Sequence, residues 1–172
     1  MTMKILHIAT SNDKGSEPFQ IARRMAIKDG AEMHDTCGNV YVVQGEELSG
    51  PLDWVKYATE SGVGHDIGWF DEIWIHGMWD RQLLKWCKEA IGARKKLVRV
   101  LHGGLDPARL KCVNRYKKWM LGHSERNILR KTDRVIAAGE WEEDWCRQWG
   151  YQGAIELFDF KQLFNLSPKQ AT

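Results

Sequence analysis

The sequence contains little cysteine, and its cysteines do not form pairs. Cys37, Cys87, Cys112 and Cys146 lie far apart, with no Cys-x-x-Cys spacing. A secreted disulfide scaffold or a structural zinc site would need a denser pattern. We therefore expect reduced thiols and a cytoplasmic protein.

Other features that mark particular classes of protein are also missing. No apolar run approaches the roughly 20 residues that span a bilayer, and the N-terminal stretch "MKILHIAT" turns polar too soon for a signal peptide. The 25 basic and 23 acidic residues nearly balance, so we expect no nucleic-acid partner. The chain has neither a GxGxxG nor a GxxxxGKS motif, and His34, His65 and His123 lack metal-ligand spacing. We therefore expect no cofactor and no metal.

The sequence does contain a regular alternation of apolar strands with amphipathic helices. With 172 residues and 43% hydrophobic content it can build one core, and we predict one domain at 1–160, followed at 161–172 by a tail or the start of an interdomain linker. Strands are predicted at 3–10, 38–45, 71–77, 95–103, 133–139 and 154–160, and helices at 19–30, 50–62, 80–92 and 140–150, with one or two more in the basic segment 108–131. This order predicts an α/β fold, a single Rossmann-like three-layer domain with a mostly parallel sheet and helices on both faces.

Two of the predicted strands end in histidine followed by glycine. His76 and Gly77 close "DEIWIHG", and "LVRVLHGG" ends in His102, Gly103 and Gly104. Ligands of open α/β sheets bind at the carboxyl ends of the strands, and a neutral imidazole can both donate and accept a hydrogen bond. His102 is therefore our candidate catalytic residue, and the other four are candidate substrate-binding residues. The alternative is that His102 only satisfies backbone groups in a glycine-rich turn.

Several neighbouring residues complete this prediction. Gly15 and Ser16 precede a helix that opens near Pro18, where backbone N–H groups would favour a phosphate or sugar hydroxyl. Trp79 follows His76 closely and offers an aromatic face for a sugar. His7 lies inside the first strand, so we expect a packed, hydrogen-bonded residue. Asp106 is expected to cap the helix that starts at Pro107.

Taken together, four segments resemble a known family. In order, "MKILHIAT", "DEIWIHGMWD", "LVRVLHGGLDP" and "SERNILRKTDRVIAAGEWEEDW" are similar to the N-terminal half of a GT-B glycosyltransferase of the family 4 group, many of whose members make lipopolysaccharide or other surface polysaccharides. The residues that match the family pattern in the last segment are Glu125, Arg126, Leu129, Asp133 and Glu140. The resemblance implies one half of a GT-B fold, the half that handles the acceptor.

The resemblance also implies a function and partners. The chain would be the acceptor-binding half of an enzyme that transfers a sugar from a nucleotide-sugar to a glycan or lipid-linked acceptor. The nucleotide-sugar would be held by a separate donor domain, so we expect the chain to be inactive alone. The first loop, "SNDKGSE", is poorer in glycine than the family pattern, and "AIELFDFKQLF" has Phe158, Asp159 and Phe160 in place of the usual Asn-Gly turn. The alternatives are therefore a catalytically inactive sugar- or lipid-binding module and, less favoured, a structural partner protein.

The basic segment 109–131 suggests a further partner. It combines many Lys and Arg residues with Tyr116, Trp119 and other apolar residues. Such a segment is either the solvated face of a helix or a surface that contacts anionic lipid. The second interpretation suits a lipid-linked acceptor and predicts peripheral association with the inner face of the membrane.

Overall fold

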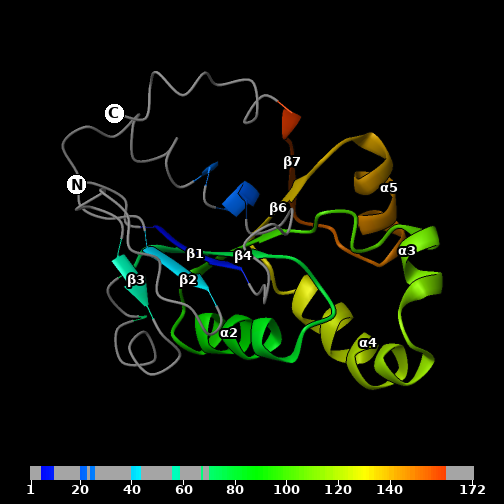
Figure 1. Ribbon diagram of the computed structural model, residues 1–172, viewed down its shortest axis with the longest axis horizontal. Coiled ribbons are helices and arrows are strands. Elements are labelled where there is room, and N and C mark those ends of the chain that lie inside the picture. Colours follow the sequence, from blue (N-terminus) through cyan, green and yellow to red (C-terminus); the bar gives the residue numbers. More distant parts are fainter. Residues whose placement is uncertain are drawn as a thin grey trace.

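The structure, a computed structural model, describes residues 5–9, 20–22, 24–25, 40–43, 56–58, 67 and 70–161 (Figure 1). Seven strands form one sheet in the order β3-β2-β1-β4-β5-β6-β7, and every pairing among them is parallel. The strands are β1 (Ile5–Ala9), β2 (Val40–Val43), β3 (Lys56–Ala58), β4 (Glu72–His76), β5 (Lys96–Val100), β6 (Arg134–Ala137) and β7 (Ala154–Leu157).

Helices cover both faces of this sheet. On one face lie α2 (Arg81–Gly92), α4 (Arg115–Leu129) and α5 (Glu140–Gln148), and the short α3 (Pro107–Cys112) precedes α4. Leu83 of α2 and Ile128 of α4 pack with Ile73 of the sheet, while Cys146 of α5 packs with Val135 of β6. The helical residues 20–22 and 24–25 lie on the opposite face, above the sheet in Figure 1, where Ile21 and Met25 pack with Trp74, Val98 and Val100. The predicted α/β fold, with a parallel sheet between helices, is confirmed.

Local sequence explains where these helices begin. The carboxylate of Asp80 accepts hydrogen bonds from the backbone N–H groups of Gln82 and Leu83, so it caps α2. Asp106 caps α3 through the N–H of Ala108, with Pro107 in the first turn, as predicted. Asn114 caps α4 in the same way, and the chain is extended at Val113, so the basic segment forms two helices.

One predicted element is wrong. The sequence pattern favours a helix at 50–62, whereas the structure has β3 at Lys56–Ala58, paired in parallel with β2. The prediction rests on a short helical period after Pro51. Val55 and Tyr57 belong to residue types that favour strands, and backbone pairing with a neighbouring strand outweighs a weak local helical preference.

The strand order places the site. β2 and β3 lie on one side of β1, and β4 to β7 lie on the other side. The strand order therefore reverses between β1 and β4. Ligands of open parallel sheets bind beside such a reversal, at the carboxyl ends of the strands. In the described part of the chain, no helix is long and apolar enough to cross a membrane. Residues 162–172 are not described, so the domain boundary at 160 stays a prediction.

Candidate functional site

Three histidines form a row that runs from the middle of β1 to the carboxyl edge of the sheet at β4 and β5. His7 belongs to β1, His76 ends β4, and His102 follows β5, so three adjacent strands each supply one ring. Nδ1 of His7 lies 3.0 Å from Nε2 of His76, and Nδ1 of His76 lies 3.2 Å from Nε2 of His102. All three residues are buried. The structure thus places His76 and His102 at the strand ends predicted for them and also brings their rings together. His7 is packed and hydrogen-bonded, as expected, and is the third member of the row.

The backbone at His102 has an uncommon conformation. Its φ is +51° and that of Gly103 is +69°, so two successive residues are left-handed. Arg109 donates from Nη1 to the carbonyl oxygen of His102, and the Phe160 ring lies 5.4 Å from the imidazole, between centroids. The outer ring nitrogen, Nδ1, is buried and has no hydrogen-bond partner among the described residues. A strained backbone and an unsatisfied buried polar atom in one residue are typical of functional sites.

Burial keeps two of these rings neutral. It lowers the pKa of His102 from 6.5 to about 3, with a further lowering from the positive charge of Arg109. Burial also holds the pKa of His76 well below 6.5, and the neighbouring rings of His7 and His102 lower it further. At neutral pH His76 and His102 therefore each carry one ring proton, and each ring offers one donor and one acceptor.

The turn after β4 is tied to the turn after β5. The indole Nε1–H of Trp79 donates to the carbonyl oxygen of Gly104 at 2.7 Å, and the Gly77 N–H donates to the carbonyl oxygen of Val100 at 2.7 Å. At Gly104 a Cβ atom would lie 2.9 Å from the side chain of Met78. The close approach of Met78 explains the glycine at position 104, and the indole hydrogen bond explains the tryptophan at position 79. Trp79 is itself buried with φ +64°, so its observed contacts are internal, and its contact with a ligand stays a prediction.

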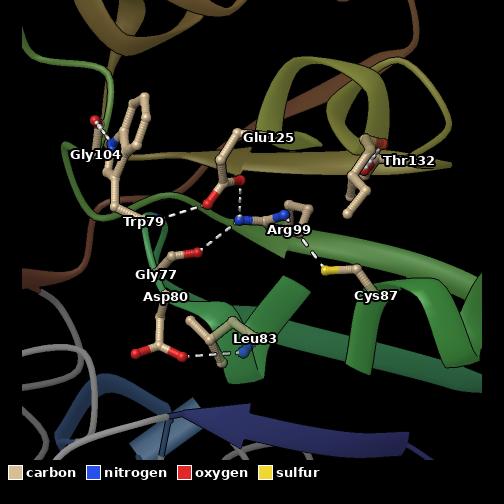
Figure 2. A network of polar contacts seen from close by, with 10 residues as sticks. Gly77, Trp79, Asp80, Leu83, Cys87, Arg99, Gly104, Glu125 and Thr132 are labelled. Carbon is tan, nitrogen blue, oxygen red and sulfur yellow. Dashed lines mark hydrogen bonds and ion pairs between the residues drawn. The ribbon is translucent and has the colours of Figure 1, made fainter. Parts of the chain in front are cut away.

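A buried ion pair holds the turn after β4, on the face of the sheet covered by α2 and α4 (Figure 2). Nη2 of Arg99 lies 3.2 Å from Oε2 of Glu125, with side-chain exposures of 1% and 0%. The same guanidinium donates to the carbonyl oxygen of Gly77 at 2.8 Å and to Sγ of Cys87 at 3.3 Å. The other carboxylate oxygen of Glu125 accepts the backbone N–H of Trp79. The pair therefore holds the backbone of the β4 turn at both Gly77 and Trp79.

The role of Arg99 is not predicted from the sequence pattern. A signal existed, since Arg99 stands between Val98 and Val100 in a strand predicted to be buried, and a buried charge needs a partner. The resemblance marks Glu125 as part of a family pattern but not as that partner.

A second buried carboxylate was also missed. Oε1 of Glu142 accepts the N–H of Gly103 and Oε2 accepts the N–H of Ala138 at 2.8 Å, so α5 joins the turns after β5 and β6. Burial raises the pKa of this carboxyl group, while the two backbone N–H groups oppose the rise. The resemblance points instead to Glu140, which is exposed in the first turn of α5. Asp133 of the same pattern accepts the N–H of Leu97 at 2.7 Å, so it is a structural residue.

Two predicted substrate-binding residues, Gly15 and Ser16, lie outside the described residues. Within the described segments, no group of three His, Cys, Asp or Glu side chains is arranged to hold a metal ion. Comparison of the sequence with known protein families finds no match, and comparison with curated proteins finds no similar sequence.

Proposed function

We propose that this chain is the acceptor-binding half of a glycosyltransferase. It would orient a hydroxyl group of a glycan or lipid-linked acceptor at the carboxyl edge of the sheet. A nucleotide-sugar held by a separate donor domain would then react with that hydroxyl. The observation that carries the proposal is the buried Nδ1 of His102, which has no partner in the described structure and stands at the edge where such folds bind ligands.

The role proposed for His102 is to hydrogen-bond the acceptor hydroxyl while remaining neutral. A pKa of about 3 makes the ring a weak base at neutral pH, but its lone pair still accepts a hydrogen bond and polarises the O–H group. His76 would hold His102, and Gly77, Gly103 and Gly104 would shape the turns beside the sugar. A neutral imidazole that is shielded from water can recognise an uncharged hydroxyl, because a hydrogen bond is stronger where water is excluded.

The substitution that tests this role is His102→Asn. Asparagine tolerates the left-handed backbone that His102 adopts, so the fold should survive. With the donor domain supplied by fusion or co-expression, transfer should fall by about a hundredfold, the low end for a group that assists proton transfer. Asn114→Ser, which keeps a capping side chain away from the site, is the matched control and should transfer normally. A folded His102→Asn variant that transfers at the normal rate would show that the histidine is only a turn residue.

The division of roles between two domains has its own test. Calorimetry with UDP- and GDP-sugars should detect little binding to this chain alone, because the donor would be held elsewhere. Micromolar binding would overturn that division. If the assembled protein binds glycan acceptors but never transfers sugar, the chain is instead an inactive sugar-binding module.

A specific observation also favours docking on an anionic membrane surface. Trp119 and Tyr116, on α4, are 78% and 64% exposed, and their rings lie 6.0 Å apart. The basic residues of the segment are Arg109, Lys111, Arg115, Lys117, Lys118, Arg126, Arg130 and Lys131, and its one acidic residue, Glu125, is buried. Exposed aromatic rings in a positive surface match an interface of anionic lipid headgroups, which suits a lipid-linked acceptor.

Vesicle sedimentation tests this docking. Binding to phosphatidylglycerol vesicles should exceed binding to phosphatidylcholine vesicles and should weaken as salt rises, because charges are screened over about 10 Å at 0.1 M. Trp119→Ser should weaken binding, whereas Trp141→Ser, at an exposed tryptophan of α5, should not. Equal binding to both kinds of vesicle would refute the electrostatic part of the proposal.

A further inference from the structure

The three histidine rings form a row in which every inter-ring contact has the same orientation. Each inter-ring contact joins Nδ1 of one imidazole to Nε2 of the next, from His7 to His76 and from His76 to His102. A ring that carries one proton has one donor nitrogen and one acceptor nitrogen. The nitrogen that carries the proton on one ring therefore determines which nitrogen carries it on the neighbouring rings.

Only two arrangements satisfy both contacts when each ring carries one proton. If His7 donates from Nδ1, Nε2 of His76 must accept, so the proton of His76 is on Nδ1 and faces an acceptor Nε2 of His102. All three rings are then Nδ1–H tautomers. In the reverse direction all three are Nε2–H tautomers. A mixed set would leave two lone pairs or two N–H groups facing each other in a buried place, which is unfavourable.

We propose that His7 and His76 are positioning residues that set, through this shared tautomer, whether the outer nitrogen of His102 donates or accepts a hydrogen bond. In the Nδ1–H state, His102 presents a proton at its outer nitrogen. In the Nε2–H state, it presents a lone pair. The functional consequence rests on the role proposed above for His102: an acceptor hydroxyl is polarised by a lone pair, so the Nε2–H state is the productive one.

The surroundings of the three rings favour a change of tautomer in all three rings together. His7 contacts the Trp74 ring at 5.0 Å and His102 contacts the Phe160 ring at 5.4 Å, between centroids, so apolar rings flank both ends. His76, in the middle, is 1% exposed. Water has little access to the two inter-ring contacts, and a mismatch there would not be relieved by solvent.

Nitrogen-15 NMR of the histidine rings tests the shared tautomer without any enzyme assay. Single His→Gln substitutions assign the resonances, and His123, whose side chain is exposed, serves as the reference for an imidazole in water. The three buried rings should show the same tautomer. Opposite tautomers in neighbouring rings, or a doubly protonated His76, would overturn the inference.

Two substitutions at His7 test its control over His102. His7→Phe removes the partner of His76 Nε2. A bound acceptor hydroxyl pairs with the outer nitrogen of His102 in either state, so the tautomer is then decided at Nε2 of His76. There an acceptor without a partner is tolerated better than a buried N–H, so His76 and His102 should both shift to the Nδ1–H tautomer. With the donor domain supplied, kcat should then fall by about tenfold while KM for the acceptor changes little. His7→Asn places an amide near the position of Nδ1 and should restore both the tautomer and kcat.

The two proposals fail in different ways. If the three rings share a tautomer but the His102→Asn variant transfers sugar normally, the inference about the histidine row holds and the proposed function is refuted. If the His102→Asn variant loses most of its transfer activity but the rings do not share a tautomer, the proposed function is supported and the inference about the histidine row is refuted. If His7→Phe does not fold, the NMR spectrum of the unaltered chain still decides the tautomer question.

Discussion

Replacing Glu125 with glutamine should destabilise the fold by about 3 kcal/mol, the cost expected when one member of a buried ion pair is lost. The substitution keeps an oxygen that accepts the N–H of Trp79, but it removes the charge that balances Arg99. The guanidinium would remain buried, with the carbonyl oxygen of Gly77 and Sγ of Cys87 as its other partners. Neither of these carries a compensating negative charge, because burial raises the pKa of the Cys87 thiol.

A double-mutant cycle isolates the pairing energy. Arg99→Met alone should also cost several kcal/mol, because it leaves the Glu125 carboxylate buried without its cation. The double variant Arg99→Met with Glu125→Gln should be more stable than the sum of the single effects predicts, by about 3 kcal/mol. Urea unfolding followed by tryptophan fluorescence and by far-UV circular dichroism measures all four proteins.

A surface pair provides the control. Lys85 and Glu89 lie 4.0 Å apart on α2, with side-chain exposures of 65% and 36%, so Glu89→Gln should change the free energy of unfolding by less than about 0.5 kcal/mol. If Glu125→Gln proves as mild as Glu89→Gln, the buried pair does not hold the β4 turn. Strictly additive effects in the cycle would refute a direct interaction between the two residues.

Three other perturbations have predictable outcomes. Because burial lowers the pKa of His102 from 6.5 to about 3, the unfolded chain takes up this proton first as the pH falls. The free energy of unfolding should decline from about pH 6.5 toward pH 3, by up to about 1.4 kcal/mol per pH unit for this ring, and His102→Asn should flatten that slope in urea titrations at several pH values. Cys112 is exposed and should react with Ellman's reagent in the folded protein, whereas Cys146, whose thiol pKa is raised by burial to about 12, should react only after unfolding; early modification of Cys146 seen by mass spectrometry would contradict this. Gly104→Ala should cost about 1–3 kcal/mol because its Cβ would meet Met78, while Gly92→Ala, which meets nothing within 4 Å, should not lower the melting temperature.

The sequence predicts the fold well because its strands carry strong local patterns. β4 and β5 each fall within the predicted segments, since a buried parallel strand is a short apolar run bounded by turn residues. The run ends in histidine and glycine in both cases, and this local pattern alone is enough to place His76 and His102 at the carboxyl edge of the sheet. β3 was missed because three residues are too few to show a period, and its pairing with β2 is a tertiary contact.

The interior of the site is less predictable because it depends on contacts between distant residues. Arg99 and Glu125 are 26 positions apart, and no local pattern links a strand residue to one on a later helix. Whether Glu140 or Glu142 is the buried residue depends on how α5 is rotated about its axis, because side chains two positions apart on a helix differ by about 200° in direction. The row of three rings depends on the register between β1, β4 and β5, where a shift of one residue would turn a side chain to the opposite face.

The same row of rings has a consequence for the order in which the molecule assembles. His76 and His102 are 26 positions apart, whereas His7 and His76 are separated by 69. Contacts between near neighbours along the chain form faster, because closing a long loop costs more entropy. During synthesis β1 leaves the ribosome first, yet its partner β4 emerges only after many more residues have been added. The edge of Ile5–Ala9 that pairs with β4 must therefore stay uncovered during that interval, even after β2 has paired with the other edge, and the growing chain is most prone to aggregation before β4 has paired.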